Sequence, residues 1–151
     1  MKTKDFTLAF TVKQTPEQVF QAINNVPAWW SGEIEGNADK LGSEFTYKVE
    51  GVHFTRQKVT EFVYGKRIVW RVSEAKISFV KDQGEWKGTD IVFEIGKKEG
   101  KTELRFTHRG LTSAYECFTD CSNAWGLLVN GNLHRLIATG KPQPSPWGVA
   151  A

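Results

Sequence analysis

The sequence predicts an α+β fold in which a curved antiparallel sheet of about six or seven strands wraps around one long C-terminal helix. Between residues 6 and 108, apolar and polar residues alternate in one segment after another, which is the pattern of strands with one buried face. Short turns join most of these segments, as expected for antiparallel neighbours. The stretch Ala114–Thr139 instead carries apolar residues at three- and four-residue steps, which is typical of an amphipathic helix.

The C-terminal helix must bury its apolar stripe against the sheet, because strands make up most of the chain before it. The stripe consists of Cys117, Cys121, Ala124, Trp125, Leu128, Leu136 and Ile137. Gly126 and Gly131 lie inside this helix, where each costs about 1 kcal/mol relative to alanine. We therefore expect the helix to bend at these glycines or to pack closely there against another element. Gly140 and the prolines after it end the helix.

The chain begins with an alternating strand over residues 6–13, and a short helix follows. Thr15 can cap this helix, Pro16 suits its first turn, and Gln18 is placed to complete a capping box. Asn24-Asn25 and the proline after them end it. A tight turn or a second short helix comes next, so we expect one or two short helices after the first strand.

Further segments with strand patterns fill the chain up to the long helix. They cover residues 45–49, 52–63, 67–73, 77–80, 91–95 and 104–108. The segment 52–63 is ambiguous, because His53, Thr55 and Gln57 share a phase that continues to Val59, and this side is a candidate semi-polar wall. A strongly twisted sheet can curl around the helix and bring the first strand beside the last.

Length and composition favour a single globular domain over residues 1–151, with residues 144–151 as a flexible, proline-containing tail. The net charge of +3 is spread along the chain without a basic block, which argues against a nucleic-acid partner. No apolar run is long enough for a membrane span, and the N-terminus lacks the apolar core of a signal peptide. We therefore expect a cytoplasmic protein in which Cys117 and Cys121 are reduced thiols.

A set of motifs lies along the chain in a characteristic order. They are Thr15-Pro16-Glu17-Gln18-Val19-Phe20, Trp29-Trp30, Leu41-Gly42-Ser43-Glu44-Phe45, Val59-Thr60-Glu61-Phe62, Lys66-Arg67-Ile68-Val69-Trp70, Thr107-His108-Arg109-Gly110-Leu111 and Trp125-Gly126. By these motifs, residues 6–142 resemble the START-like (SRPBCC) superfamily and, within it, the bacterial group similar to activators of the heat-shock-protein-90 ATPase. Two features depart from that group. Ser43 replaces the second glycine of its strand-entry motif, and residues 74–87 are longer and more irregular than its usual hairpin.

The resemblance implies a helix-grip fold with a ligand cavity between the sheet and the C-terminal helix. Strand alternation and the helix stripe then indicate which residues line that cavity, and the double tryptophan is placed near its mouth. The candidate lining residues are Trp29, Trp30, Tyr47, His53, Trp70, Phe93, Phe106, His108, Cys117, Cys121, Trp125 and Leu128. The alternative is that these side chains simply form the core, as aromatic residues at strand spacing usually do.

His108 is the polar candidate of greatest interest, because it occupies the apolar phase of the last strand. It is either a buried neutral histidine held by a hydrogen bond or a residue that contacts a ligand. A metal site or a nucleophilic pair formed with Cys117 or Cys121 has no recognised spacing, and both cysteines lie among apolar neighbours. The carboxylates fall on exposed phases or loops, so we assign no catalytic residue, no metal and no cofactor.

Three functions remain open from the sequence. The first is binding of a small hydrophobic or aromatic ligand in the cavity without catalysis, with His108, His53 or Tyr47 fixing its orientation. The second, implied by the resemblance, is a co-chaperone-like module that contacts a heat-shock-protein-90 homologue in a stress response. The third is a cyclase- or hydratase-like enzyme that uses the same cavity, with His108 as general acid or base.

Overall fold

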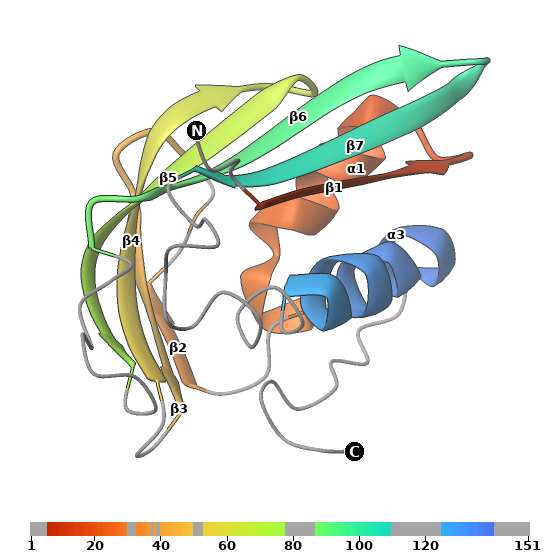
Figure 1. The fold of residues 1–151 in the computed structure, drawn as a ribbon. Helices are drawn as coiled ribbons and strands as arrows, with labels where there is room; N and C mark the ends of the chain where they lie inside the picture. The colour runs from red at the N-terminus through yellow and green to blue at the C-terminus, as the bar shows by residue number, and fades with distance from the viewer. Residues whose placement is uncertain are drawn as a thin grey trace, which may run out of the picture.

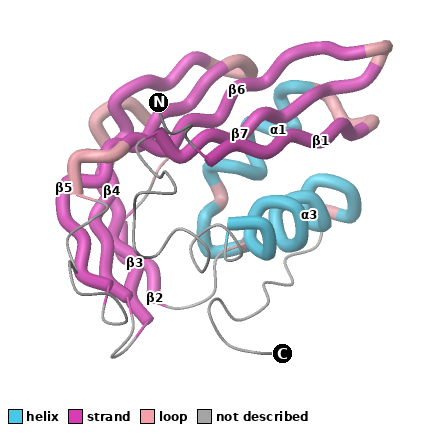
Figure 2. The backbone as a smooth tube through the Cα atoms, in the orientation of Figure 1, coloured by secondary structure: helices cyan, strands magenta, loops and turns pink. Residues whose placement is uncertain are grey.

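The computed structural model describes residues 6–29, 33–36, 38, 40–49, 53–77, 87–109 and 125–140. Within these residues, seven strands form one antiparallel sheet in the order β1-β7-β6-β5-β4-β3-β2. The sheet bends from β1, β7 and β6 through β5 and β4 to β3 and β2, and the helices lie on its concave side (Figure 1, Figure 2). The predicted α+β architecture, a curved sheet around the C-terminal helix, is confirmed.

The strands have the following bounds: β1 Phe6–Val12, β2 Glu33–Gly36, β3 Glu44–Val49, β4 His53–Val63, β5 Arg67–Ile77, β6 Asp90–Lys98 and β7 Lys101–Arg109. The first strand lies beside the last, as predicted. β1 pairs with β7 along its whole length, so that Phe6 is opposite His108 and Val12 is opposite Thr102. This pairing brings the two ends of the strand run together.

Two strands differ from the sequence pattern. β2 is not predicted, because Ile34 is its only apolar residue, and pairing with β3 rather than alternation makes it a strand. β5 continues to Ile77, where the pattern indicates a break after Ser73. The continuation is possible because β4 shifts its register against β5 between Arg56 and Gln57 and stays paired with it.

The strand faces follow alternation closely. On β7, Leu104, Phe106 and His108 are buried, while Arg105 and Arg109 are exposed. The ambiguous strand is resolved in the same way: Thr55, Gln57 and Val59 are all buried. The concave side of β4 therefore carries polar side chains inside the fold.

The first helix closes one end of the sheet. α1 (Pro16–Asn24) has the predicted capping box, in which Thr15 Oγ1 accepts a hydrogen bond from the Gln18 N–H and the Gln18 side chain accepts one from the Thr15 N–H. Its buried face is Val19, Phe20 and Ile23. The short helix η1 (Val26–Ala28) follows and leads directly to Trp29.

The C-terminal helix is described from Trp125 onward, and the predicted part from Ala114 to Ala124 lies outside the described residues. It consists of a π-helix, η2 (Gly126–Leu133), followed by α3 (His134–Thr139), and it ends at Gly140 with a φ of 73°. Both interior glycines lie in η2, and a Cβ at either would meet no described atom within 4 Å. The two glycines therefore lie where the helix type changes, the described residues do not show close packing there, and a bend at the glycines stays a prediction.

Replacing the helix cap should weaken the fold by a predictable amount. Thr15→Ala removes the side-chain acceptor for the Gln18 N–H, and we expect it to lower the free energy of unfolding by about 1 kcal/mol. Urea unfolding followed by circular dichroism measures this change. The control is Gln21→Ala, an exposed position on the same helix, which should lie within about 0.5 kcal/mol of the wild type. Equal effects of the two substitutions would contradict the capping role.

Candidate functional site

A series of aromatic rings crosses the concave side of the sheet and ends on the C-terminal helix. The ring series consists of Phe45 on β3, Trp70 on β5, Phe93 on β6, Phe106 on β7 and Trp125 beside η2, and each is at most 1% exposed. Successive ring centroids are 4.9, 4.8, 5.4 and 4.7 Å apart. These distances are those of favourable ring contacts, so the series forms one continuous apolar surface.

Trp29 joins the ring series to both helical parts of the fold. Its ring stacks on Trp70 with centroids 6.3 Å apart and meets Phe93 edge-on at 6.1 Å. Its indole N–H donates to the Ile23 carbonyl at 3.2 Å, which ties it to α1. The buried Asn132 of η2 donates from Nδ2 to the Trp29 carbonyl at 3.2 Å. One residue therefore connects α1, the sheet and the π-helix.

Polar side chains without charge occupy the concave side of β3 and β4. The Gln57 amide donates to Thr55 Oγ1 at 2.6 Å, and both residues are 0% exposed. Tyr47 lies opposite Thr55 in the strand register, and Phe45 lies opposite Gln57. We call Tyr47, Thr55 and Gln57 the polar wall. The sequence pattern of β4 predicts such a semi-polar side, and the structure buries it.

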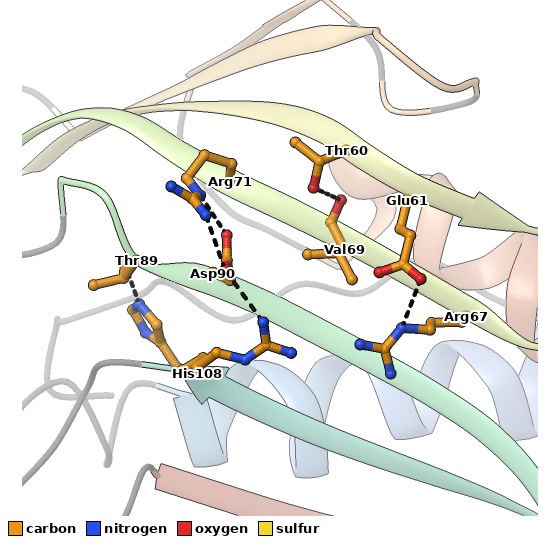
Figure 3. A network of polar contacts seen from close by, with 9 residues as sticks. Thr60, Glu61, Arg67, Val69, Arg71, Thr89, Asp90 and His108 are labelled. Atoms are coloured by element: carbon orange, nitrogen blue, oxygen red, sulfur yellow. Dashed lines mark hydrogen bonds and ion pairs between the residues drawn. The ribbon is translucent and has the colours of Figure 1, made fainter.

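His108 is held by hydrogen bonds on both ring nitrogens. The Trp125 indole N–H donates to His108 Nδ1 at 3.0 Å, and Thr89 Oγ1 lies 2.8 Å from His108 Nε2 (Figure 3). An indole nitrogen can only donate, so Nδ1 must carry the lone pair. His108 is therefore a neutral Nε2–H tautomer, and its Nε2–H donates to Thr89.

Burial sets the charge state of this histidine. Complete desolvation lowers the pKa of His108 from its usual 6.5 to about 3, because the charged form would lose its hydration. The neutral form is also the one that can accept the hydrogen bond from Trp125 at Nδ1. At neutral pH, His108 therefore serves as a hydrogen-bonding element of the interior, and this geometry favours the first of the two readings from the sequence.

Charged residues occupy the opposite, convex side. Arg67 pairs with Glu61 at 3.1 Å (Figure 3), and it also pairs with Glu94 at 2.9 Å. Asp90 pairs in the same way with two arginines, Arg71 and Arg109. Each of these ion pairs joins two neighbouring strands between β4 and β7. The side chains described above on the concave side are uncharged.

The structure brings together most of the predicted lining residues. Those placed in the buried interior are Trp29, Tyr47, Trp70, Phe93, Phe106, His108, Trp125 and Leu128. Trp30, Cys117 and Cys121 lie outside the described residues; His53 begins β4, but its side chain is not described. That these residues line a ligand cavity stays a prediction.

Three buried residues of this interior are not among the candidates predicted from the sequence. Phe45 shares its alternation phase with Tyr47, so that pattern could have added it to the candidates. Asn132 lies seven residues after Trp125, on the same helical stripe, and a polar residue there is a usable signal. Thr89 precedes β6 in an irregular position, and its contact with His108 has no signal in the local sequence.

Among the described residues, no three His, Cys, Asp or Glu side chains are grouped closely enough to hold a metal ion. No helix in the described ranges is long and apolar enough to cross a membrane.

Comparison with known proteins relates this geometry to one family. The family model described as "Activator of Hsp90 ATPase homolog 1-like protein" matches residues 13–137. The solution structure of the Aha1 dimer from Colwellia psychrerythraea is 24% identical, has a TM-score of 0.72, and aligns over 91% of this chain and 98% of its own. None of the curated proteins matches the chain.

Two further solved structures share the fold at lower identity. DynU16, a protein in the dynemicin biosynthetic locus, is 15% identical with a TM-score of 0.66, over 90% of this chain and 48% of its own. BH1534 from Bacillus halodurans is 16% identical with a TM-score of 0.61, over 85% of this chain and 94% of its own. At these identities, the likeness shows the fold alone.

The buried histidine should make the protein sensitive to acid. Because the pKa of His108 is lower in the folded chain than in the unfolded chain, the unfolded state binds the proton first, and stability falls as the pH drops below 6.5. We expect His108 alone to remove about 2 kcal/mol of unfolding free energy between pH 7.5 and pH 5. Urea unfolding at several pH values measures this slope.

The matched variants are His108→Gln and His134→Gln. The first cannot titrate, so its stability should fall less steeply than that of the wild type over the same pH range. The second replaces a partly exposed histidine of α3 and is the control for the loss of a histidine side chain. Identical slopes for His108→Gln and the wild type would show that the buried histidine does not control the acid response.

Proposed function

The chain belongs to the family of activator of Hsp90 ATPase homolog 1-like proteins, and from this premise we propose that it binds a small hydrophobic or aromatic molecule. The site is the interior between the C-terminal helix and the concave side of the sheet. We propose that Trp29, Tyr47, Trp70, Phe93, Phe106, His108, Trp125 and Leu128 are its described lining residues.

The ring series is the observation that carries this proposal. Five rings from β3, β5, β6, β7 and the C-terminal helix present one apolar surface. A planar aromatic ligand can replace ring–ring contacts with equivalent contacts of its own. Each Å² of apolar ligand surface removed from water adds about 25 cal/mol. The adjoining polar wall and His108 supply the few polar groups that orient a ligand in such sites.

The π-helix supports the same location. Helical turns of this type are rare and frequently occur at functional sites. Leu128 and Leu133 of η2 are buried, and Asn132 reaches from it to the Trp29 carbonyl. An irregular helix segment is therefore the element that covers the rings, and a change in its turns would alter the space beneath it.

We expect direct binding to be measurable with aromatic probes. Titration with 2-naphthol, the flavonoid naringenin and oleate, followed by amide and indole chemical shifts, should move signals of Trp125 and of the concave strands. Phe106→Leu should weaken aromatic binding by roughly 2- to 10-fold, because it removes one ring contact. Tyr64→Ala, at an exposed ring with 59% relative exposure, is the control and should bind as the wild type does. If none of these compounds shifts both the helix and the strands, the ligand-binding function is wrong.

Contact with a chaperone of the Hsp90 class is a second candidate, favoured by the family match. The charged convex side of the sheet, with its exposed arginines, offers a polar surface for such a contact. We expect the ATPase rate of a purified bacterial Hsp90 homologue to rise when the protein is added. An unrelated protein of similar net charge is the control. A rate that stays the same over a concentration series would count against this function.

We do not propose the enzymatic alternative. It requires His108 to exchange a proton with a substrate near neutral pH. Both of its ring nitrogens are engaged, and its pKa is about 3. On the neighbouring strand β6, Asp90 precedes the residue opposite His108 and is paired with Arg71 and Arg109 on the convex side.

A further inference from the structure

Two buried polar groups on the concave side of β3 and β4 have no hydrogen-bond partner among the described residues. They are Gln57 Oε1, in a residue that is 0% exposed, and Ser43 Oγ, in a residue that is 8% exposed. Buried polar groups are nearly always paired, so each such exception requires a physical explanation. The simplest explanation for an unpaired polar group in the interior is that a ligand bound there supplies the missing hydrogen bond.

The strand register places the two groups close to each other. The Val59 N–H donates to the Ser43 carbonyl at 2.8 Å, and Phe45 lies opposite Gln57. Ser43 and Gln57 are therefore diagonal neighbours on one side of the β3–β4 pair, about 7–8 Å apart at their Cα atoms. Phe45, the first member of the ring series, lies beside both of them.

The residues opposite Gln57 on both neighbouring strands are apolar. Gln57 lies between Phe45 on β3 and Val72 on β5 in the strand register, and both are at most 1% exposed. Thr55 occupies one end of the carboxamide at 2.6 Å. A hydroxyl can donate or accept, so this contact forms with either orientation of the amide. In the orientation that the structure has, Oε1 at the other end of the carboxamide has no hydrogen-bond partner among the described residues.

We infer that Gln57, assisted by Ser43, binds a hydroxyl group carried by an aromatic ligand whose ring lies against Phe45 and Trp70. This inference rests on the proposed ligand-binding function and names the ligand class within it. A hydroxyl matches the free end of the amide in either orientation, because it can donate to Oε1 or accept from Nε2. An apolar ring of the same size would leave the amide unpaired in a water-free site.

The charge distribution supports a neutral ligand. The charged neighbours on β4, Arg56 and Lys58, alternate with Gln57, and Arg56 is paired with Glu74 on the convex side. No described cation lies among the residues opposite Ser43 and Gln57 in the strand register to match a carboxylate or a phosphate. A phenol-like hydroxyl can enter without burying a charge.

The test compares two probes that differ by one group. 2-Naphthol and 2-methylnaphthalene have nearly the same shape, but only the first carries a hydroxyl. We expect Gln57→Leu, which removes both polar atoms of the carboxamide, to shift the ratio of their dissociation constants by about tenfold in favour of the methyl compound. Ser43→Ala should shift the ratio in the same direction by a smaller factor. Lys58→Ala, on the opposite side of β4, is the control and should keep the wild-type ratio.

The possible outcomes distinguish a failure of this inference from a failure of the proposed ligand-binding function. If both probes bind the wild type and Gln57→Leu leaves their ratio unchanged, Gln57 does not select hydroxylated ligands, although ligand binding itself stands. If neither probe binds the wild type, the inference fails, and the titrations with naringenin and oleate decide whether the ligand-binding function stands. Urea unfolding of each variant accompanies the titrations, because Gln57→Leu removes the unpaired Oε1 and also the amide that donates to the buried Thr55 Oγ1. Ser43→Ala alone decides the question if Gln57→Leu does not fold.

Discussion

The hydrogen bond from the Trp125 indole N–H to His108 Nδ1 is the contact on which the interior depends. It joins the C-terminal helix to β7 at a point from which water is excluded, and it determines which tautomer of the histidine is present. Thr89 is then the acceptor for the remaining ring N–H. A buried imidazole nitrogen without its partner would cost free energy, so the helix position and the charge state of His108 are linked.

The curved sheet separates charge from aromatic surface. Ion pairs of Arg67, Arg71 and Asp90 lie on the convex side, where the arginines stay partly exposed and the buried Asp90 is paired with two arginines. The concave side carries the ring series, the polar wall and a neutral histidine. This division follows from the high cost of moving a charge out of water. It also favours a neutral ligand in the interior, because a charged ligand would need a counter-charge on the concave side.

Sequence periodicity predicts local structure well and contacts poorly. The buried sides of β4 and β7, the capping box at Thr15 and the helix end at Gly140 all follow from residues close together in the chain. β2 does not, because it depends on pairing with β3. The candidate site shows the same difference. Alternation identifies His108 as buried, but its partner Thr89 lies 19 residues earlier in an irregular position. The parts played by Trp30, Cys117 and Cys121 stay predictions.

The sequence by itself determined the fold class, the buried phase of nearly every strand and the apolar stripe over the described part of the C-terminal helix, because each depends on a repeat of two or about 3.6 residues. Only the tertiary structure decided which buried rings meet, which polar groups stay unpaired and where the C-terminal helix becomes a π-helix. Those features depend on strand order, register and helix placement. They are set by contacts between distant segments, such as Phe106 with Trp125, that no local pattern encodes.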